Sequence, residues 1–198
     1  MKPRPALFLD RDGVINIDHA YVCRQEEFVF VDGIFELCRH ARKLGYLILV
    51  VTNQAGIGRG YYTEHDFLKL TEWMCGIFSA EGGAIDKVYF CPTHPEHGVG
   101  KYKVDSPFRK PGPGMLLKAA TDLRIDLSRS WMVGDRLSDV LAGVNAGCRS
   151  IRVRTGYQYP GPCRSKNIAS RPRDVANLPF VVLWFPSHDR QGVFPQWP

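Results

Sequence analysis

The sequence has no long apolar run. Its longest continuous apolar stretches are 46–51 and 180–185, whereas a membrane-spanning helix needs roughly 20 such residues. Only four consecutive apolar residues precede Asp10, which is too short for the apolar core of a secretory signal peptide. We therefore expect a cytoplasmic protein with no membrane partner.

The chain also lacks a basic block and paired cysteines. Its net charge is +6, and its 17 arginines are dispersed, which argues against a nucleic-acid-binding arm. The excess of arginine suits an anionic small substrate, because a guanidinium binds phosphate through two hydrogen bonds. An ordinary soluble surface is the alternative explanation for this positive charge. Six cysteines occur without a Cys-x-x-Cys pair, so we expect free thiols.

The sequence does contain an alternation of short apolar strands with amphipathic helices. Strands are predicted at 6–9, 46–51, 87–91, 131–133 and 150–153, and helices at 33–44, 63–78, 113–123 and 136–146. This alternation predicts an α/β fold with a mostly parallel sheet. In such sheets, ligands bind at the carboxyl ends of the strands.

The length of 198 residues fits one domain. We expect this domain to cover residues 1–185, with 175–185 adding a helical turn and an edge strand. Half of the 14 prolines lie in the last 43 residues, and residues 186–198 are predicted to be an irregular proline-rich tail.

Two carboxylates follow the first predicted strand. Asp10 and Asp12 are two residues apart, and Gly13 allows the chain to turn directly after them. Such a pair can provide a nucleophile and a general acid, or it can bind a metal ion. Taken alone, the segment is also compatible with an aspartate-rich turn that only ends a strand.

Three later segments carry related chemistry. Thr52, Asn53 and Gln54 offer donors for phosphoryl oxygens, Lys110 precedes a helix where it can neutralise a phosphate, and Asp135 ends the fourth strand. Each has an ordinary alternative: a glycine-rich loop, a solvated basic loop or a helix cap. Together they predict Mg²⁺-assisted phosphoryl transfer at one edge of the sheet.

These segments resemble the motifs of the haloacid dehalogenase (HAD) superfamily of phosphatases. The matching stretches are FLDRDGVIN (8–16), DHAYV (18–22), VTNQAGIGRGYYTE (51–64), CPTHP (91–95), RKPGPGM (109–115) and VGDRLSDV (133–140). The stretches at 18–22 and 51–64 are closest to the D-glycero-D-manno-heptose 1,7-bisphosphate phosphatase subgroup, which is related to histidinol-phosphate phosphatases. The resemblance implies a Rossmann-like HAD fold, with helices on both faces of the sheet and no large cap domain.

The resemblance also implies roles by position. Asp10 would be the nucleophile that forms an aspartyl-phosphate, Asp12 the general acid and then the base, and Lys110 a clamp on the phosphoryl group. The metal would be Mg²⁺, bound by Asp10, by the main-chain carbonyl of Asp12 and by Asp135. The implied substrate-binding residues are Thr52, Asn53, Gln54, Arg59, Arg109 and Arg136.

One departure from the subgroup concerns zinc. Many members bind structural Zn²⁺ with Cys-x-His and then Cys-x-Cys directly before Arg-Lys-Pro. Here Cys91 remains, but Thr93, Ser106 and Phe108 occupy the other three positions. One ligand of four cannot hold a tetrahedral zinc ion, so we expect none, and the loop is predicted to be held by packing and hydrogen bonds. The alternative is another metal site made of Cys91, His94, His97 and Asp105.

The implied function is Mg²⁺-dependent hydrolysis of the 7-phosphate of D-glycero-D-manno-heptose 1,7-bisphosphate, in the synthesis of lipopolysaccharide core or other heptose glycoconjugates. We expect a monomer that acts on a small sugar phosphate and binds no nucleic acid. The alternatives are a phosphatase of histidinol phosphate or of another small phosphate monoester, a DNA 3′-phosphatase, and a non-catalytic scaffold. A scaffold has no physical need for Asp10, Asp12, Lys110 and Asp135 together.

Overall fold

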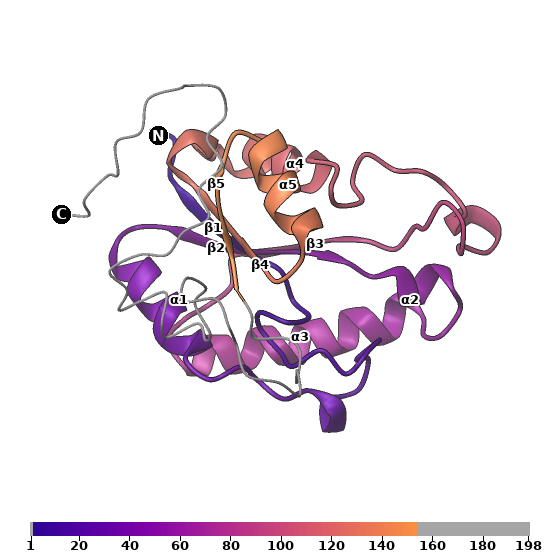
Figure 1. Ribbon diagram of the computed structural model, residues 1–198. Helices are drawn as coiled ribbons and strands as arrows, with labels where there is room; N and C mark the ends of the chain where they lie inside the picture. Colours follow the sequence, from indigo (N-terminus) through magenta and orange to yellow (C-terminus); the bar gives the residue numbers. More distant parts are fainter. Residues whose placement is uncertain (1, 154–198) are drawn as a thin grey trace, which may run out of the picture.

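The computed structural model describes residues 2–153 of the chain (Figure 1). Five parallel strands form one sheet in the order β3-β2-β1-β4-β5. The strands are β1 (Ala6–Leu9), β2 (Leu47–Asn53), β3 (Lys87–Cys91), β4 (Trp131–Gly134) and β5 (Arg149–Arg152). Since β2 and β4 flank β1 on opposite sides, the connections reverse direction at β1, and ligands of open α/β sheets bind at such a point.

Helices cover both faces of the sheet (Figure 1). They are α1 (Ile34–Lys43), α2 (Ala55–Gly58), α3 (Glu64–Ala80), α4 (Gly114–Leu123) and α5 (Leu137–Asn145). Single 3₁₀ turns lie at Gln25–Glu27, Gly100–Tyr102 and Leu127–Arg129. No helix among residues 2–153 is both long enough and apolar enough to cross a membrane.

The alternation of side chains along β1 divides the core into two layers. Leu7 and Leu9 pack in the cluster that includes residues of α1 and α3, whereas Ala6 and Phe8 pack with residues of α4 and α5. All four are buried, as expected for a strand in the middle of a parallel sheet covered on both faces. The predicted α/β fold with helices on both faces is therefore confirmed.

The predicted elements agree with the structure to within one or two residues at each end. β1 and β3 have the predicted bounds, and Thr63 caps α3 by a reciprocal capping box with Asp66. However, β2 extends to Asn53, because Thr52 and Asn53 continue the pairing with β3. Residues 55–58 then form the one-turn helix α2, where no helix was predicted. Thr52 therefore projects from a rigid strand end.

Two long connections leave the carboxyl edge of the sheet. Residues 10–33, between β1 and α1, form a flap in which Asn16 pairs with Phe30. Between β3 and α4, residues 92–113 form a loop with one 3₁₀ turn. Within residues 2–153, neither connection is a cap domain, as predicted. The predictions of a single domain over 1–185, of structure at 175–185 and of a tail at 186–198 extend outside the described residues.

Candidate active site

A cavity of about 720 Å³ opens at the carboxyl ends of the strands. The end of β1, the end of β2, the loop before α4 and the start of α5 all contribute polar side chains to its wall. The predicted residues Asp10, Asp12, Thr52 and Lys110 are among those that line it. The four separated motifs therefore meet at one place, as the parallel sheet predicts.

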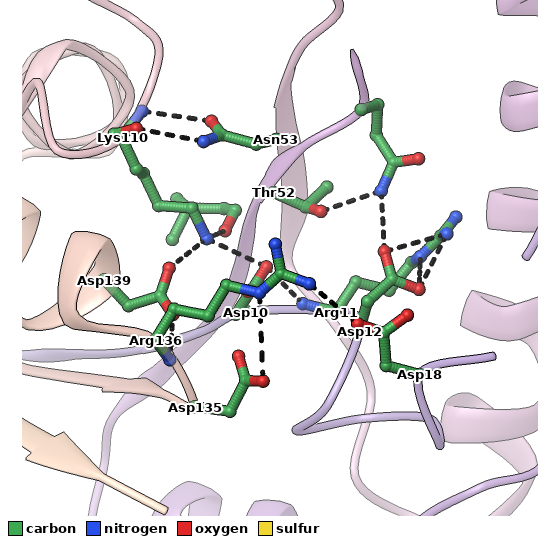
Figure 2. Close-up of polar contacts among 12 residues, drawn as sticks. Asp10, Arg11, Asp12, Asp18, Thr52, Asn53, Lys110, Asp135, Arg136 and Asp139 are labelled. Atoms are coloured by element: carbon green, nitrogen blue, oxygen red, sulfur yellow. Dashed lines mark hydrogen bonds and ion pairs between the residues drawn. The ribbon is translucent and has the colours of Figure 1, made fainter. Parts of the chain in front are cut away.

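Asp10 lies at the centre of this group (Figure 2). Its Oδ1 accepts a hydrogen bond from the backbone N–H of Arg11 at 2.8 Å and faces Nζ of Lys110 at 2.8 Å. Burial raises the pKa of Asp10 to about 7, and the nearby lysine partly opposes this rise. Because desolvation disfavours the charged form, a further cation beside Asp10 would favour its carboxylate.

Lys110 joins two carboxylates. Its Nζ lies 2.8 Å from Oδ1 of Asp10 and 2.6 Å from Oδ1 of Asp139, and it donates a hydrogen bond to the carbonyl of Val51 at 2.9 Å (Figure 2). Burial lowers the pKa of Lys110, but the two carboxylates outweigh it, so the net pKa is raised. Lys110 is therefore a fixed positive charge directly beside the carboxylate of Asp10.

Asn53 holds the backbone of Lys110. Its Oδ1 accepts from the N–H of Lys110 at 3.0 Å, and its Nδ2 donates to the carbonyl of Lys110 at 3.0 Å. Sequence reasoning assigned Asn53 to substrate binding. In the structure, both the oxygen and the nitrogen of its amide bind the backbone of Lys110.

Asp135 provides the strongest indication of a cation site. Its buried carboxylate oxygens have no hydrogen-bond partner among the described residues, although Nε of Arg136 lies 4.0 Å from Oδ2. Burial, followed by the charge of Asp139, raises the pKa of Asp135 to about 6. Carboxylate oxygens of Asp10, Asp135 and Asp139 lie within 4.8 Å of one another. Oxygen ligands of this kind suit Mg²⁺.

Gly13 makes the approach of Asp135 possible. The backbone of Gly13 has φ +88°, and a Cβ at this position would lie 2.5 Å from Oδ2 of Asp135. A side chain there would be strained and would also collide with the carboxylate. The glycine after the two aspartates thus lets β1 and β4 bring Asp10 and Asp135 together.

Asp139 belongs to the site, although the sequence analysis gave it no role. Its Oδ1 pairs with Lys110, and its Oδ2 accepts from the backbone N–H of Arg136 at 2.9 Å. One carboxylate therefore caps α5 and positions the lysine. Its place four residues after Asp135, at the start of a helix, was the signal that could have found it.

Asp12 is held by donors on several sides. Arg11 approaches it with Nε at 3.2 Å and Nη2 at 2.9 and 3.0 Å, Asn16 donates from Nδ2 at 3.1 Å, and Gln54 donates from Nε2 at 3.1 Å. The guanidinium of Arg11 is buried and also donates to the carbonyl of Val22 in the flap at 2.7 Å. Sequence reasoning missed Arg11 and Asn16, because their role depends on the turn that follows β1.

Thr52 remains able to donate to a ligand. Its Oγ1 accepts a hydrogen bond from Nε2 of Gln54 at 2.8 Å, so its own hydroxyl hydrogen is available to the cavity that it lines. Gln54 was assigned to substrate binding, but in the structure its amide contacts other side chains of the site. Both residues are buried.

Three arginines line the rim of the cavity: Arg59, Arg109 and Arg136. Arg109 donates to the carbonyl of Thr93 at 3.1 Å, and the guanidinium of Arg59 lies 5.9 Å from the centre of the Tyr21 ring. Burial is the main cause of a lowered pKa at Arg109, and the charges of Arg59 and Arg136 lower it further. The rim therefore concentrates positive charge that suits an anion.

Arg136 also reaches the flap. Its Nη2 lies 2.8 Å from Oδ2 of Asp18 (Figure 2). Oδ1 of Asp18 accepts from the backbone N–H of Ala20 at 2.9 Å. Ala20 and Tyr21 have φ of 63° and 58°, a conformation that residues other than glycine seldom adopt. The ion pair therefore holds a turn of the flap over the cavity.

The loop that departs from the zinc-binding pattern has its own contacts. Sγ of Cys91 lies 3.3 Å from Oγ1 of Thr93, and Oγ of Ser106 accepts from the backbone of Phe108 at 3.2 Å. The backbone N–H of Val99 donates to Gly58 at 2.8 Å. The first two contacts are local to the two ends of the loop, and the bond from Val99 ties its middle to α2.

Comparison with known proteins places the chain among phosphatases. A profile of the HAD-hydrolase-like family matches residues 107–178. The D-glycero-alpha-D-manno-heptose-1,7-bisphosphate 7-phosphatase of Burkholderia mallei is 65% identical over 183 residues, which cover 92% of this chain and 95% of that protein. The D-glycero-beta-D-manno-heptose-1,7-bisphosphate 7-phosphatase of Vibrio cholerae is 49% identical over 154 residues, covering 77% and 83%.

A solved structure has the same arrangement of elements. The D,D-heptose 1,7-bisphosphate phosphatase of B. bronchiseptica, crystallised with magnesium and phosphate, is 28% identical to this chain. It aligns with a TM-score of 0.73, over 87% of this chain and 96% of that one.

Proposed function

The chain belongs to the heptose-1,7-bisphosphate 7-phosphatase family of HAD-like hydrolases, and we propose that it removes the 7-phosphate of D-glycero-α-D-manno-heptose 1,7-bisphosphate with the help of Mg²⁺. The observation that supports this most is the site itself. A nucleophilic carboxylate, Asp10, is paired with the buried Lys110, and the buried carboxylate of Asp135 beside it has no hydrogen-bond partner among the described residues.

The first step transfers the phosphoryl group to the protein. A carboxylate oxygen of Asp10 forms a bond to phosphorus, and the bond between phosphorus and the sugar oxygen breaks. Asp12 gives its proton to that leaving oxygen, while Lys110 and the hydroxyl of Thr52 stabilise the charge on the other phosphoryl oxygens.

The second step regenerates the enzyme. Asp12, now a carboxylate, takes a proton from a water molecule whose oxygen attacks phosphorus, and the bond to Asp10 breaks to release inorganic phosphate. Bound Mg²⁺ supplies positive charge that offsets the repulsion between Asp10 and a dianionic ester. Asp10, Asp135 and the main-chain carbonyl of Asp12 would hold it, and the unpartnered oxygens of Asp135 fit this assignment.

The choice of anomer follows from the relatives. The Burkholderia mallei enzyme, at 65% identity, is named for the α anomer, and the Vibrio cholerae enzyme, at 49%, for the β anomer. We assign the phosphate at position 1 to the arginine rim of Arg59, Arg109 and Arg136, because this rim faces the cavity beside the reacting carboxylates. We also propose that the enzyme is a cytoplasmic monomer.

The test is phosphate release with Mg²⁺, with and without a chelator. The panel holds both heptose bisphosphate anomers, histidinol phosphate, fructose 1,6-bisphosphate and a DNA 3′-phosphate. We expect kcat/KM for the α anomer to exceed that for every other compound by about tenfold or more, since differences in transition-state binding of 1–3 kcal/mol are usual for a tuned pocket. The chelator is expected to stop the reaction. A preference for histidinol phosphate or DNA, or release that the chelator leaves unchanged, would contradict the proposal.

Metal analysis tests the loop at 91–108. We expect the purified protein to contain far less than one zinc ion per chain, because Thr93, Ser106 and Phe108 offer no thiolate or imidazole. A triple variant with Thr93→His, Ser106→Cys and Phe108→Cys is the matched control and should gain one zinc ion. One zinc ion per chain in the unmodified protein would show that another set of ligands binds it.

A further inference from the structure

The proposed function leaves part of the segment 51–64 without a role. Tyr62 is buried and its hydroxyl donates to Oε1 of Gln54 at 2.5 Å. The amide nitrogen of Gln54 donates in turn to Oδ2 of Asp12 at 3.1 Å and to Oγ1 of Thr52 at 2.8 Å. A chain of hydrogen bonds thus connects a tyrosine to the general acid, and the reaction described above does not require it.

This chain determines which way the amide of Gln54 faces. The two ends of a glutamine amide have nearly the same shape, but one end only accepts hydrogen bonds and the other only donates them. In the structure the nitrogen end of the amide faces Oδ2 of Asp12, and the oxygen end faces the hydroxyl of Tyr62. Burial raises the pKa of Tyr62, so its hydroxyl keeps the proton that it donates to the amide oxygen. A flipped amide would lose this bond and the bonds from its nitrogen to Asp12 and Thr52.

The backbone is arranged to admit the tyrosine ring. A Cβ on Gly56 would overlap the ring of Tyr62, so α2 can lie against this ring only with glycine at that position. The ring also packs with Ile57 and Phe67 in a small buried cluster. The glycine-rich helix α2 is therefore shaped around Tyr62.

We propose that Tyr62 and Gln54 are positioning residues for the general acid: the tyrosine hydroxyl orients the amide, and the amide holds the carboxyl group of Asp12 where it protonates the leaving oxygen. The inference rests on the proposed function, in which Asp12 is that acid. Arg11 and Asn16 hold the same carboxylate from other directions. Gln54 is the donor among these three that also lines the cavity.

The test compares two leaving groups. A sugar or alkyl alcohol has to be protonated as it leaves, whereas 4-nitrophenolate leaves without a proton, so the loss of a general acid affects only the first. With Mg²⁺ present, kcat/KM is measured for an alkyl phosphate and for 4-nitrophenyl phosphate, and the ratio is compared between variants. Any effect on Thr52 acts on the phosphoryl group common to both substrates and cancels in the ratio.

The variants are Tyr62→Phe, which removes one oxygen atom, and Gln54→Leu, which removes the amide. We expect the alkyl-to-aryl ratio to fall on the order of tenfold in both, with KM nearly unchanged. Asp12→Asn sets the upper limit, with a fall in the ratio of about 10²–10⁴-fold. Tyr61→Phe is the matched control, because Tyr61 is exposed and lies outside this hydrogen-bond chain; its ratio should equal that of the unmodified protein.

The outcomes distinguish a failure of this inference from a failure of the proposed mechanism. If Asp12→Asn lowers the ratio but Tyr62→Phe and Gln54→Leu lower both rates equally or not at all, then the two residues only pack, and the inference is wrong while the proposed function stands. If Asp12→Asn itself leaves the ratio unchanged, Asp12 is not the general acid, and the proposed mechanism fails together with the inference. Should Tyr62→Phe not fold, Gln54→Leu decides the result.

Discussion

Replacing Asp10 with asparagine is expected to reduce phosphate release by about 10⁴-fold or more, because the variant has no anionic oxygen to attack phosphorus. The substitution retains the shape of the side chain and an oxygen for the hydrogen bond from the N–H of Arg11. The fold should therefore persist. The measurement is turnover with saturating Mg²⁺ and heptose bisphosphate, alongside thermal unfolding of the same samples.

A second readout makes this assignment specific. Acid quenching during turnover should trap a phosphorylated protein in the unmodified enzyme and none in Asp10→Asn. Asp122→Asn is the matched control, since Asp122 is a surface residue paired with Lys87 and Lys118, and it should retain the full rate. Turnover of Asp10→Asn within tenfold of the unmodified rate would remove Asp10 from the role of nucleophile.

Replacing Lys110 with methionine is expected to lower both activity and stability. The substitution leaves the carboxylates of Asp10 and Asp139 facing each other in a buried site without their shared cation. Loss of one partner from a buried ion pair costs about 3–5 kcal/mol of unfolding free energy. Loss of a positive charge that stabilises the transferring group should lower kcat by about 10³-fold.

Urea unfolding with and without Mg²⁺ measures the stability effect. We expect Mg²⁺ to restore more stability to Lys110→Met than it adds to the unmodified protein, because the bound cation offsets part of the uncompensated negative charge. Lys118→Met is the control, since that lysine forms an exposed pair with Asp122 and such pairs contribute little. Equal urea midpoints for Lys110→Met and the unmodified protein would show that the buried pairs do not support the fold.

Local sequence patterns were sufficient to predict the bounds of a strand or helix where the residues that set those bounds lie within one segment. The strands at 6–9 and 87–91 could be predicted with their observed bounds because apolar runs end there at polar or turn residues. The start of α3 could be predicted from Thr63 and Asp66, because their reciprocal hydrogen bonds lie within the first turn of the helix. The end of β2 was placed too early, because its last residues belong to a strand only through pairing with β3, almost 40 residues away.

For this protein, the sequence by itself determined the fold class and the main chemical groups. Strand ends could be located from hydropathy, and parallel strands bring their carboxyl ends to one edge, so Asp10, Asp12 and Asp135 were expected there. Lys110 lies in the loop before α4, and its motif placed it at the same edge. The stretches that contain them also carry the resemblance to the HAD superfamily. These conclusions need only the order of segments, which the sequence contains directly.

Only the tertiary structure decided which partner each polar residue of the site contacts. Asn53 holds the backbone of Lys110, Asp139 pairs with that lysine, and Gln54 connects Asp12 to Tyr62. Each contact depends on donor and acceptor atoms being placed within a few tenths of an ångström. Packing between segments as much as 57 residues apart sets that placement, and no local pattern contains it.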